Sequence, residues 1–300
     1  MEKPQQLCKV IYLLMPAMPT EVTMNDIKVV PVENDAVINV SIKNEDPIKV
    51  SVGGCIELAD VADASYNFGD YVTTESKIES GIYINSNMKS YVNSYLTTIN
   101  ANNAFLGSLL NTFNAPNLTE IKGTFVFNGC TKLQRAIISK GCTVIPQGTF
   151  YACRSLLDVP NAENLVNVIG QSFAYCNMLT LINLPKVENI EAFAFAQCAQ
   201  LNAVILPSIN TLKANAFNNC HALQLVDVGD KCTTITNSTF SISRCQLNLI
   251  VRAIKPPTLT GVLMLGSGGK VISIKVPAQY VDVYKSAPVW STYADIITAI

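Results

Sequence analysis

The sequence predicts a mainly β chain that folds as a repeat solenoid, and three observations support this. A phenylalanine recurs every 22 or 23 residues, a cysteine and a leucine follow it at fixed distances, and alternating apolar residues fill the space between motifs. Charged residues make up only 14% of the chain, below the roughly 25% of an ordinary soluble domain. A length of 300 residues allows two domains or one elongated array with additions at its ends, and the repeats favour the array.

The repeated motif is FxxCxxL, which occurs five times with the same internal spacing. Its phenylalanines are Phe127, Phe150, Phe173, Phe195 and Phe217. A sixth copy begins at Phe240, and we expect it to carry two additional residues before Cys245, followed by Leu247. The six repeats, from about Phe127 to Arg252, have the period of leucine-rich repeats, roughly 20 to 29 residues.

Apolar residues alternate after each motif leucine, as at Leu179, Ile182 and Leu184, which is typical of a short strand with one buried face. A second apolar position recurs five residues before each next phenylalanine. It is occupied by Ile145, Val168, Ile190, Leu212 and Ile235. One coil cannot bury these residues alone, so we expect parallel strands about 4.8 Å apart in a stack whose neighbours cover one another.

Further motifs carry a family resemblance. Leu-Pro follows the strand at residues 184–185 and 206–207, and Ala-Phe precedes the turn at 194–195 and 216–217. The C-terminal segment adds Pro256-Pro257, Val276-Pro277, Tyr284-Lys285, Trp290 and Tyr293 in order. Over residues 105–300 the chain resembles the BspA-like leucine-rich repeat proteins of host-associated bacteria, some protists and bacteriophages. The resemblance implies a leucine-rich-repeat solenoid of about six repeats with a C-terminal cap, acting through surface recognition.

Three regions are expected. Residues 1–100 are predicted to form an N-terminal β-rich module, a candidate for docking the chain, with strands at Ile27–Val32, Val37–Ile42 and Ile48–Val52. Residues 101–252 form the solenoid and residues 253–300 the cap. The segment Tyr83–Leu96 fits either a helix or a strand.

The chain has ten cysteines, and six are assigned to one repeated position. These are Cys130, Cys153, Cys176, Cys198, Cys220 and Cys245. We predict that they are buried, reduced and structural, because side chains stacked in parallel do not face each other as a disulfide requires. Zinc would need CxxC pairs or histidine partners, and the only histidine, His221, is predicted to lie on an exposed turn. The sequence therefore predicts no catalytic, cofactor or metal site.

Charge and hydropathy also exclude classes of partner. The net charge is −1 without a basic run, which argues against nucleic-acid binding. The apolar stretch Val10–Met18 is far shorter than the ~20 residues that span a bilayer, so no membrane insertion is expected. Glu2 beside Lys3 and the absence of a cleavage site make this stretch a poor signal peptide.

The outward face of the predicted sheet is the candidate binding site. The second and fourth residues after each motif leucine should point away from the core, and many are apolar, which is typical of contact surfaces. The second positions are Arg135, Asp158, Leu181, Ala203, Leu225 and Leu249, and the fourth positions are Ile137, Pro160, Asn183, Ile205, Asp227 and Val251. The predicted partner-binding residues are Ile137, Leu181, Asn183, Ile205, Leu225, Asp227, Leu249 and Val251. The alternative is that the N-terminal module or the cap covers this face.

These expectations define a non-enzymatic recognition protein. The resemblance, taken together with the poor signal peptide, favours a phage virion component, a tail or fibre protein that presents a receptor-binding surface, located at the virion surface. The alternative is a bacterial cell-surface adhesin that binds host or matrix proteins. Expected partners are a protein or cell-surface receptor, other virion proteins, or a second copy of the chain.

Overall fold

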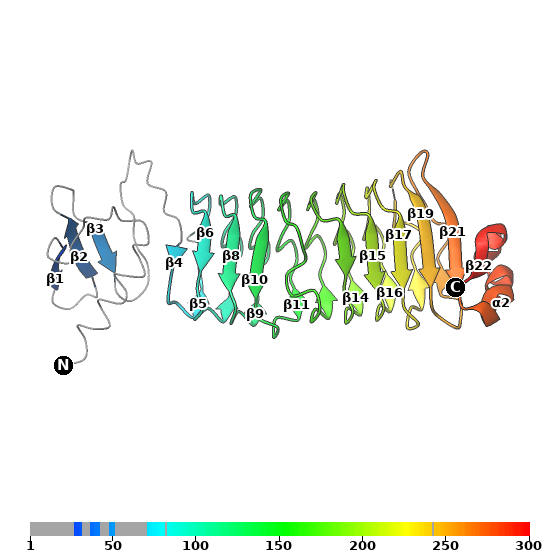
Figure 1. The fold of residues 1–300 in the computed structure, drawn as a ribbon, viewed down its shortest axis with the longest axis horizontal. Helices are drawn as coiled ribbons and strands as arrows, with labels where there is room; N and C mark the ends of the chain where they lie inside the picture. Colours follow the sequence, from blue (N-terminus) through cyan, green and yellow to red (C-terminus); the bar gives the residue numbers. More distant parts are fainter. Residues whose placement is uncertain (1–26, 32–36, 43–47, 52–70, 82, 242) are drawn as a thin grey trace.

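The computed structural model describes residues 27–31, 37–42, 48–51, 71–81, 83–241 and 243–300. From Tyr71 onward the chain winds into an elongated β-solenoid whose coils stack side by side (Figure 1). This confirms the predicted mainly β leucine-rich-repeat architecture. In the described part of the chain, no helix has the length and apolar character needed to cross a membrane.

One strand of each coil contributes to a long parallel array in two sheets. The first contains β4 (Tyr71–Val72), β6 (Ser90–Val92), β8 (Thr112–Ala115) and β10 (Arg135–Ile138). The second contains β13 (Leu181–Asn183), β15 (Ala203–Leu206), β17 (Leu225–Val228), β19 (Gln246–Val251), β21 (Lys270–Val276) and β22 (Ile297–Ala299).

The two sheets are interrupted at the coil that contains Pro160, which forms no strand at this position. Proline has no backbone N–H and cannot donate to a strand ladder. Its neighbour Val159 is still buried. The apolar core therefore continues through a coil whose hydrogen-bond ladder is broken.

A second array of two-residue strands lines another side of the coils (Figure 1). Its first sheet holds β5 (Lys77–Ile78), β7 (Thr98–Ile99) and β9 (Glu120–Ile121). Its second sheet holds β11 (Val144–Ile145), β12 (Asn167–Val168), β14 (Asn189–Ile190), β16 (Thr211–Leu212), β18 (Thr234–Ile235) and β20 (Thr258–Leu259). In each of these sheets the second residue of every strand is buried, as the repeated apolar position predicts.

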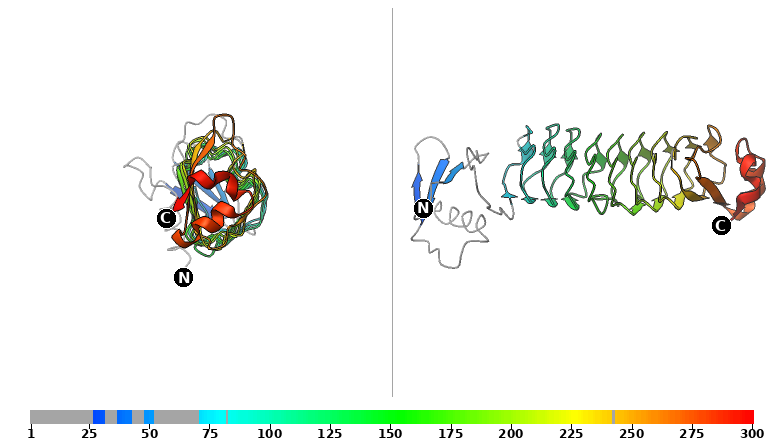
Figure 2. Two further views of the ribbon diagram at one scale, coloured as in Figure 1. Left: turned by 90° about the vertical axis from the view of Figure 1, so that its right-hand side faces the viewer. Right: turned by 90° about the horizontal axis from the view of Figure 1, so that it is seen from above.

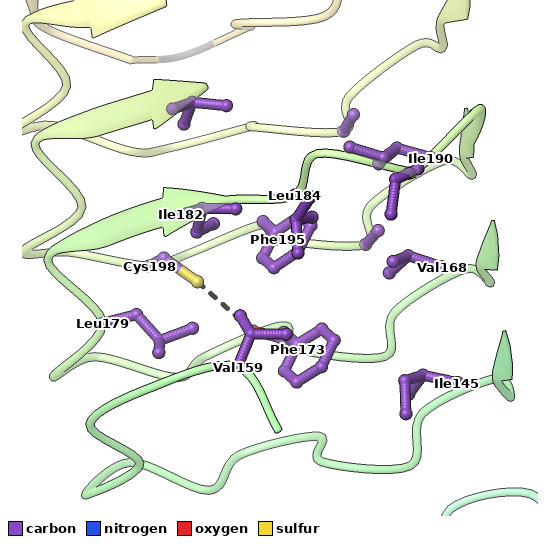
Figure 3. Packing of buried hydrophobic residues seen from close by; sticks show 14 of the residues in the cluster. Ile145, Val159, Val168, Phe173, Leu179, Ile182, Leu184, Ile190, Phe195 and Cys198 are labelled. Carbon is purple, nitrogen blue, oxygen red and sulfur yellow. Dashed lines mark hydrogen bonds between the residues drawn. The ribbon is translucent and has the colours of Figure 1, made fainter. Parts of the chain in front are cut away.

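The core is a continuous stack of aromatic rings beside a column of thiols. Rings of neighbouring coils lie parallel, with centroids 5.1 Å apart between Phe173 and Phe195 and 5.7 Å between Phe195 and Phe217. Beside them, the Cys198 thiol donates a hydrogen bond to the Phe173 carbonyl oxygen at 3.2 Å (Figure 3). The same bond joins Cys130, Cys153, Cys176 and Cys220 to the preceding coil, so the spacing of these motifs is set by contacts between coils.

The stack begins before residue 101, where the sequence placed its boundary. Strands β6 and β7 pair in parallel with β8 and β9 of the next coil, so residues 71–100 form coils of the same solenoid. Within the segment Tyr83–Leu96 the structure shows strand β6 and no helix. Upstream, β1 (Ile27–Pro31), β2 (Val37–Ile42) and β3 (Ile48–Ser51) form an antiparallel sheet, as predicted; the other residues before Tyr71 lie outside the described part.

The C-terminal segment closes the end of the stack (Figure 2). It contains η2 (Ala278–Tyr280), α2 (Val281–Ser286) and η3 (Trp290–Ile296) before β22. The Tyr284 hydroxyl donates to the Ala253 carbonyl oxygen at 2.8 Å, and the Trp290 indole N–H donates to that of Pro257 at 2.7 Å. These bonds fix the two rings over the last coil, which gives the predicted cap residues their structural role.

Candidate functional site

The last predicted repeat has a different register from the expected one. Strand β19 pairs with β17 so that Asn248 lies beside Leu225 and Ile250 lies beside Asp227. Leu249 and Val251, predicted to face outward, are fully buried. A shift of one residue exchanges the two faces of a strand. The prediction was wrong for these two residues, and Asn248 and Ile250 take their outward places.

The cause of the shift is that the sixth copy contains no additional residues. Ser243 follows Phe240 by three residues, and its hydroxyl donates to the Phe217 carbonyl oxygen at 2.9 Å, the bond that a column cysteine makes elsewhere. Cys245 is buried, as predicted, but it lies outside the column.

The remaining predicted contact residues differ in exposure and position. Leu181 is 53% exposed and Asn183 is also exposed, whereas Ile205 and Leu225 are half-buried on β15 and β17. These four lie on one sheet. Ile137 is 43% exposed but belongs to β10 in the other sheet, beyond the coil interrupted at Pro160. The predicted face is therefore divided in two.

Asp227 lies on this face but is neutralised within the chain. Its two carboxylate oxygens accept hydrogen bonds from the Arg252 Nε at 2.8 Å and the Arg252 terminal nitrogen at 2.7 Å. This two-bond geometry is the strong form of an Arg–carboxylate pair, and it raises the pKa of the Arg252 guanidinium. Asp227 therefore adds little net charge to the face.

Next to the apolar residues, the outward face carries two adjoining shallow hollows. The larger, of about 410 Å³, is lined by Asn202, Ala203, Gln224, Leu225, Asn248, Ile250, Ser273 and Lys275. The smaller, of about 300 Å³, is lined by His221, Ala222, Leu223, Gln224, Arg244, Cys245, Gln246, Asn248 and Ile272. Gln224 and Asn248 line both, so we call the combined feature the C-terminal trough.

A bulge shapes the trough. Between Leu247 and Asn248 the pairing of β19 with β21 shifts by one residue, which places Ile272 as the extra residue, 41% exposed. The repeat pattern does not predict this site, because a bulge and the shift in β19 register change which side chains face outward. Alternating polar and apolar residues in 270–276 could have indicated the strand, but not the bulge.

The described cysteines are buried thiols without disulfide bonds. Burial raises the pKa of the Cys153, Cys176, Cys198 and Cys220 thiols well above 9.0. A thiol that stays protonated is a poor nucleophile and metal ligand. In the described part of the chain, no group of three or more His, Cys, Asp or Glu side chains could hold a metal ion.

The repeat geometry agrees with the comparison to known families. The sequence matches the family model described as "BspA type Leucine rich repeat region" in six copies, over residues 76–186 and 167–255. The chain belongs to the BspA-type leucine-rich repeat family. The match begins near β5, which agrees with a BspA-type stack that starts upstream of residue 101.

The comparison with solved structures found leucine-rich repeat proteins at low similarity. A leucine-rich repeat protein from Bacteroides ovatus aligns at 17% identity and a TM-score of 0.41, covering 85% of this chain and 71% of that one. A leucine-rich cell surface protein from Faecalibacterium prausnitzii aligns at 16% identity and a TM-score of 0.35, covering 94% of this BspA-type chain and 95% of the other. No curated protein matches the sequence.

Proposed function

We propose that this BspA-type protein is a non-enzymatic recognition protein that binds a partner protein through the outward face of β13 and β15. The supporting observation is the exposure of Leu181 beside the half-buried Ile205 on a rigid parallel sheet. Solenoids use such continuous surfaces for binding, and exposed apolar groups commonly mark contact sites. The cap packs at the end of the stack (Figure 2), so the cap does not cover this face.

The family resemblance supports two settings. We propose a receptor-binding component of a phage particle, with a bacterial surface adhesin as the alternative. Both roles require a partner on a cell surface and an exposed recognition face. Antibodies against the protein should label purified particles in the first case and intact producing cells in the second.

The test is a pair of charge substitutions on the face. Leu181→Asp with Ile205→Asp should abolish binding of the labelled protein to receptor-bearing cells, because a carboxylate without a partner is strongly disfavoured at a buried interface. The control, Asn167→Asp with Thr211→Asp, places two charges on the outward side of β12 and β16 and should bind normally. Circular dichroism should show the same fold for both variants. A folded Leu181/Ile205 variant with unchanged binding would exclude this face.

A further inference from the structure

The C-terminal trough presents hydrogen-bond donors and positive charge without a carboxylate. Lys275 and Arg244 line its two parts, and neither forms an ion pair with another described residue. The side-chain amides of Asn202 and Gln224 are also without a hydrogen-bond partner among the described residues. No Asp or Glu of the described chain lines either hollow. The nearest carboxylate on the strands of this face, that of Asp227, is neutralised by Arg252.

The trough is also held in shape by internal bonds. The side-chain amide of Asn248 donates to the backbone carbonyl oxygen of Gln224 at 3.1 Å. Its oxygen accepts a hydrogen bond from the Ser273 hydroxyl at 2.6 Å. Its apolar lining includes aliphatic side chains, with Leu225 and Ile250 in one part and Ile272 in the other. No Phe, Tyr or Trp side chain of the described chain lines it, and His221 supplies the one ring, an imidazole, in the lining of the smaller hollow. Aliphatic and amide groups beside cations fit an acidic polypeptide segment with aliphatic side chains.

The charge distribution of the chain identifies one such segment. Residues 192–300 contain eight Lys and Arg against four Asp and Glu, whereas residues 1–79 contain six against thirteen. Between residues 50 and 76 there are five acidic residues and no Lys or Arg. Within this stretch the sequence IELADVADA, residues 56–64, alternates Glu57, Asp60 and Asp63 with aliphatic residues. Its charge and apolar content are complementary to those of the trough.

We propose that the C-terminal trough of one copy binds the acidic segment 56–64 of a second copy, so that the chains associate head to tail. The segment of the same copy would reach the trough only if the intervening chain were close to full extension, which is costly in conformational entropy. Eight coil steps of about 4.8 Å separate β4 from β19, roughly 38 Å in all, and the eleven residues from Asp60 to Tyr71 span about 37 Å at full extension. A contact between different surfaces produces rings or filaments instead of closed two-fold dimers. This assembly goes beyond the proposed partner recognition on β13 and β15.

The test compares association in charge-reversal variants of the full chain. Light scattering over a range of protein concentrations should show association of the wild type that weakens with added salt, because the contact is electrostatic. Arg244→Glu with Lys275→Glu should weaken association at least about tenfold. The control, Lys255→Glu with Lys285→Glu, changes the charge equally at exposed positions outside the trough and should associate like the wild type.

A complementary variant separates this contact from other causes of association. Glu57→Lys with Asp60→Lys and Asp63→Lys should also weaken self-association, and mixing it with the trough variant should restore a complex by pairing opposite charges. A wild type that stays monomeric at all concentrations would overturn the proposal, even if the trough bound a foreign acidic protein. Unchanged association of the folded trough variant would overturn it as well. Cell binding by the Leu181/Ile205 variant is a separate measurement, so failure of the proposed function is distinguishable.

Discussion

Ser243 occupies in its coil the position that Cys220 occupies in the preceding one. The Ser243 hydroxyl accepts a hydrogen bond from the Cys220 backbone N–H at 2.9 Å and donates one to the Phe217 carbonyl oxygen at 2.9 Å. The Cys220 thiol donates to the Phe195 carbonyl oxygen at 3.2 Å. The repeated position therefore requires a small side chain that donates a hydrogen bond. A hydroxyl and a thiol both meet this requirement, so no property specific to sulfur is needed.

This requirement predicts the ranking of substitutions at Cys198. Cys198→Ser should be at least as stable as Cys198→Ala, because the hydroxyl can donate to the Phe173 carbonyl oxygen as the thiol does. If that bond were unimportant, burying the hydroxyl would make the serine variant less stable by about 1–3 kcal/mol. The free energies of unfolding from urea titrations of both variants decide between these outcomes.

The serine at this position also explains why the register of β19 was predicted incorrectly. Aligning Cys245 with the other cysteines introduced two additional residues, and the alternation in β19 was then read from the wrong starting point. Because side chains alternate along a strand, this slip exchanged Asn248 and Ile250 with Leu249 and Val251. The five regular copies contained no such ambiguity, and their buried phenylalanines, cysteines and leucines could be predicted from spacing alone. The exception is Pro160, which was predicted to face outward but is buried in a coil without a strand.

The upstream coils were missed for a related reason. Tyr83 takes the phenylalanine position, and its ring stacks on Phe105 with centroids 4.8 Å apart. Ser108 takes the cysteine position in the next coil, within 3.2 Å of the Cys130 sulfur. Tyrosine packs in the ring stack as phenylalanine does, and serine is small enough to take the place of cysteine, so the structure repeats where the letters FxxC do not. The trough depends on a bulge and on contacts between coils, which no local pattern specifies.

The buried thiols predict a pH dependence of stability. Burial raises the pKa of the Cys153, Cys176, Cys198 and Cys220 thiols well above 9.0 in the folded state. Above about pH 9 the unfolded chain releases these protons first, so the unfolded state binds fewer protons and stability falls as the pH rises. Their contribution is fully present below about pH 9. Each thiol adds a slope of roughly 1.4 kcal/mol per pH unit.

The measurement is the free energy of unfolding between about pH 8 and pH 10.5. Cys198→Ala should reduce the slope of the unfolding free energy against pH by the contribution of one thiol. Ser267→Cys, which adds a thiol at an exposed position, should leave this slope unchanged. Identical slopes in the wild type and in Cys198→Ala would contradict a raised pKa for this thiol.

The last prediction uses two phenylalanines that lie two residues apart. The Phe195 ring is fully buried and stacks on Phe173 and Phe217, so Phe195→Ala should cost about 3–5 kcal/mol of unfolding free energy. Phe193 is 41% exposed and has a φ of 61°, a conformation that alanine tolerates no worse than phenylalanine. Phe193→Ala should therefore change stability by less than about 1 kcal/mol. Urea denaturation of the two variants under the same conditions tests this difference. Equal losses would mean that the aromatic stack contributes no more than a surface ring, and that contacts between coils do not depend on the repeated phenylalanine.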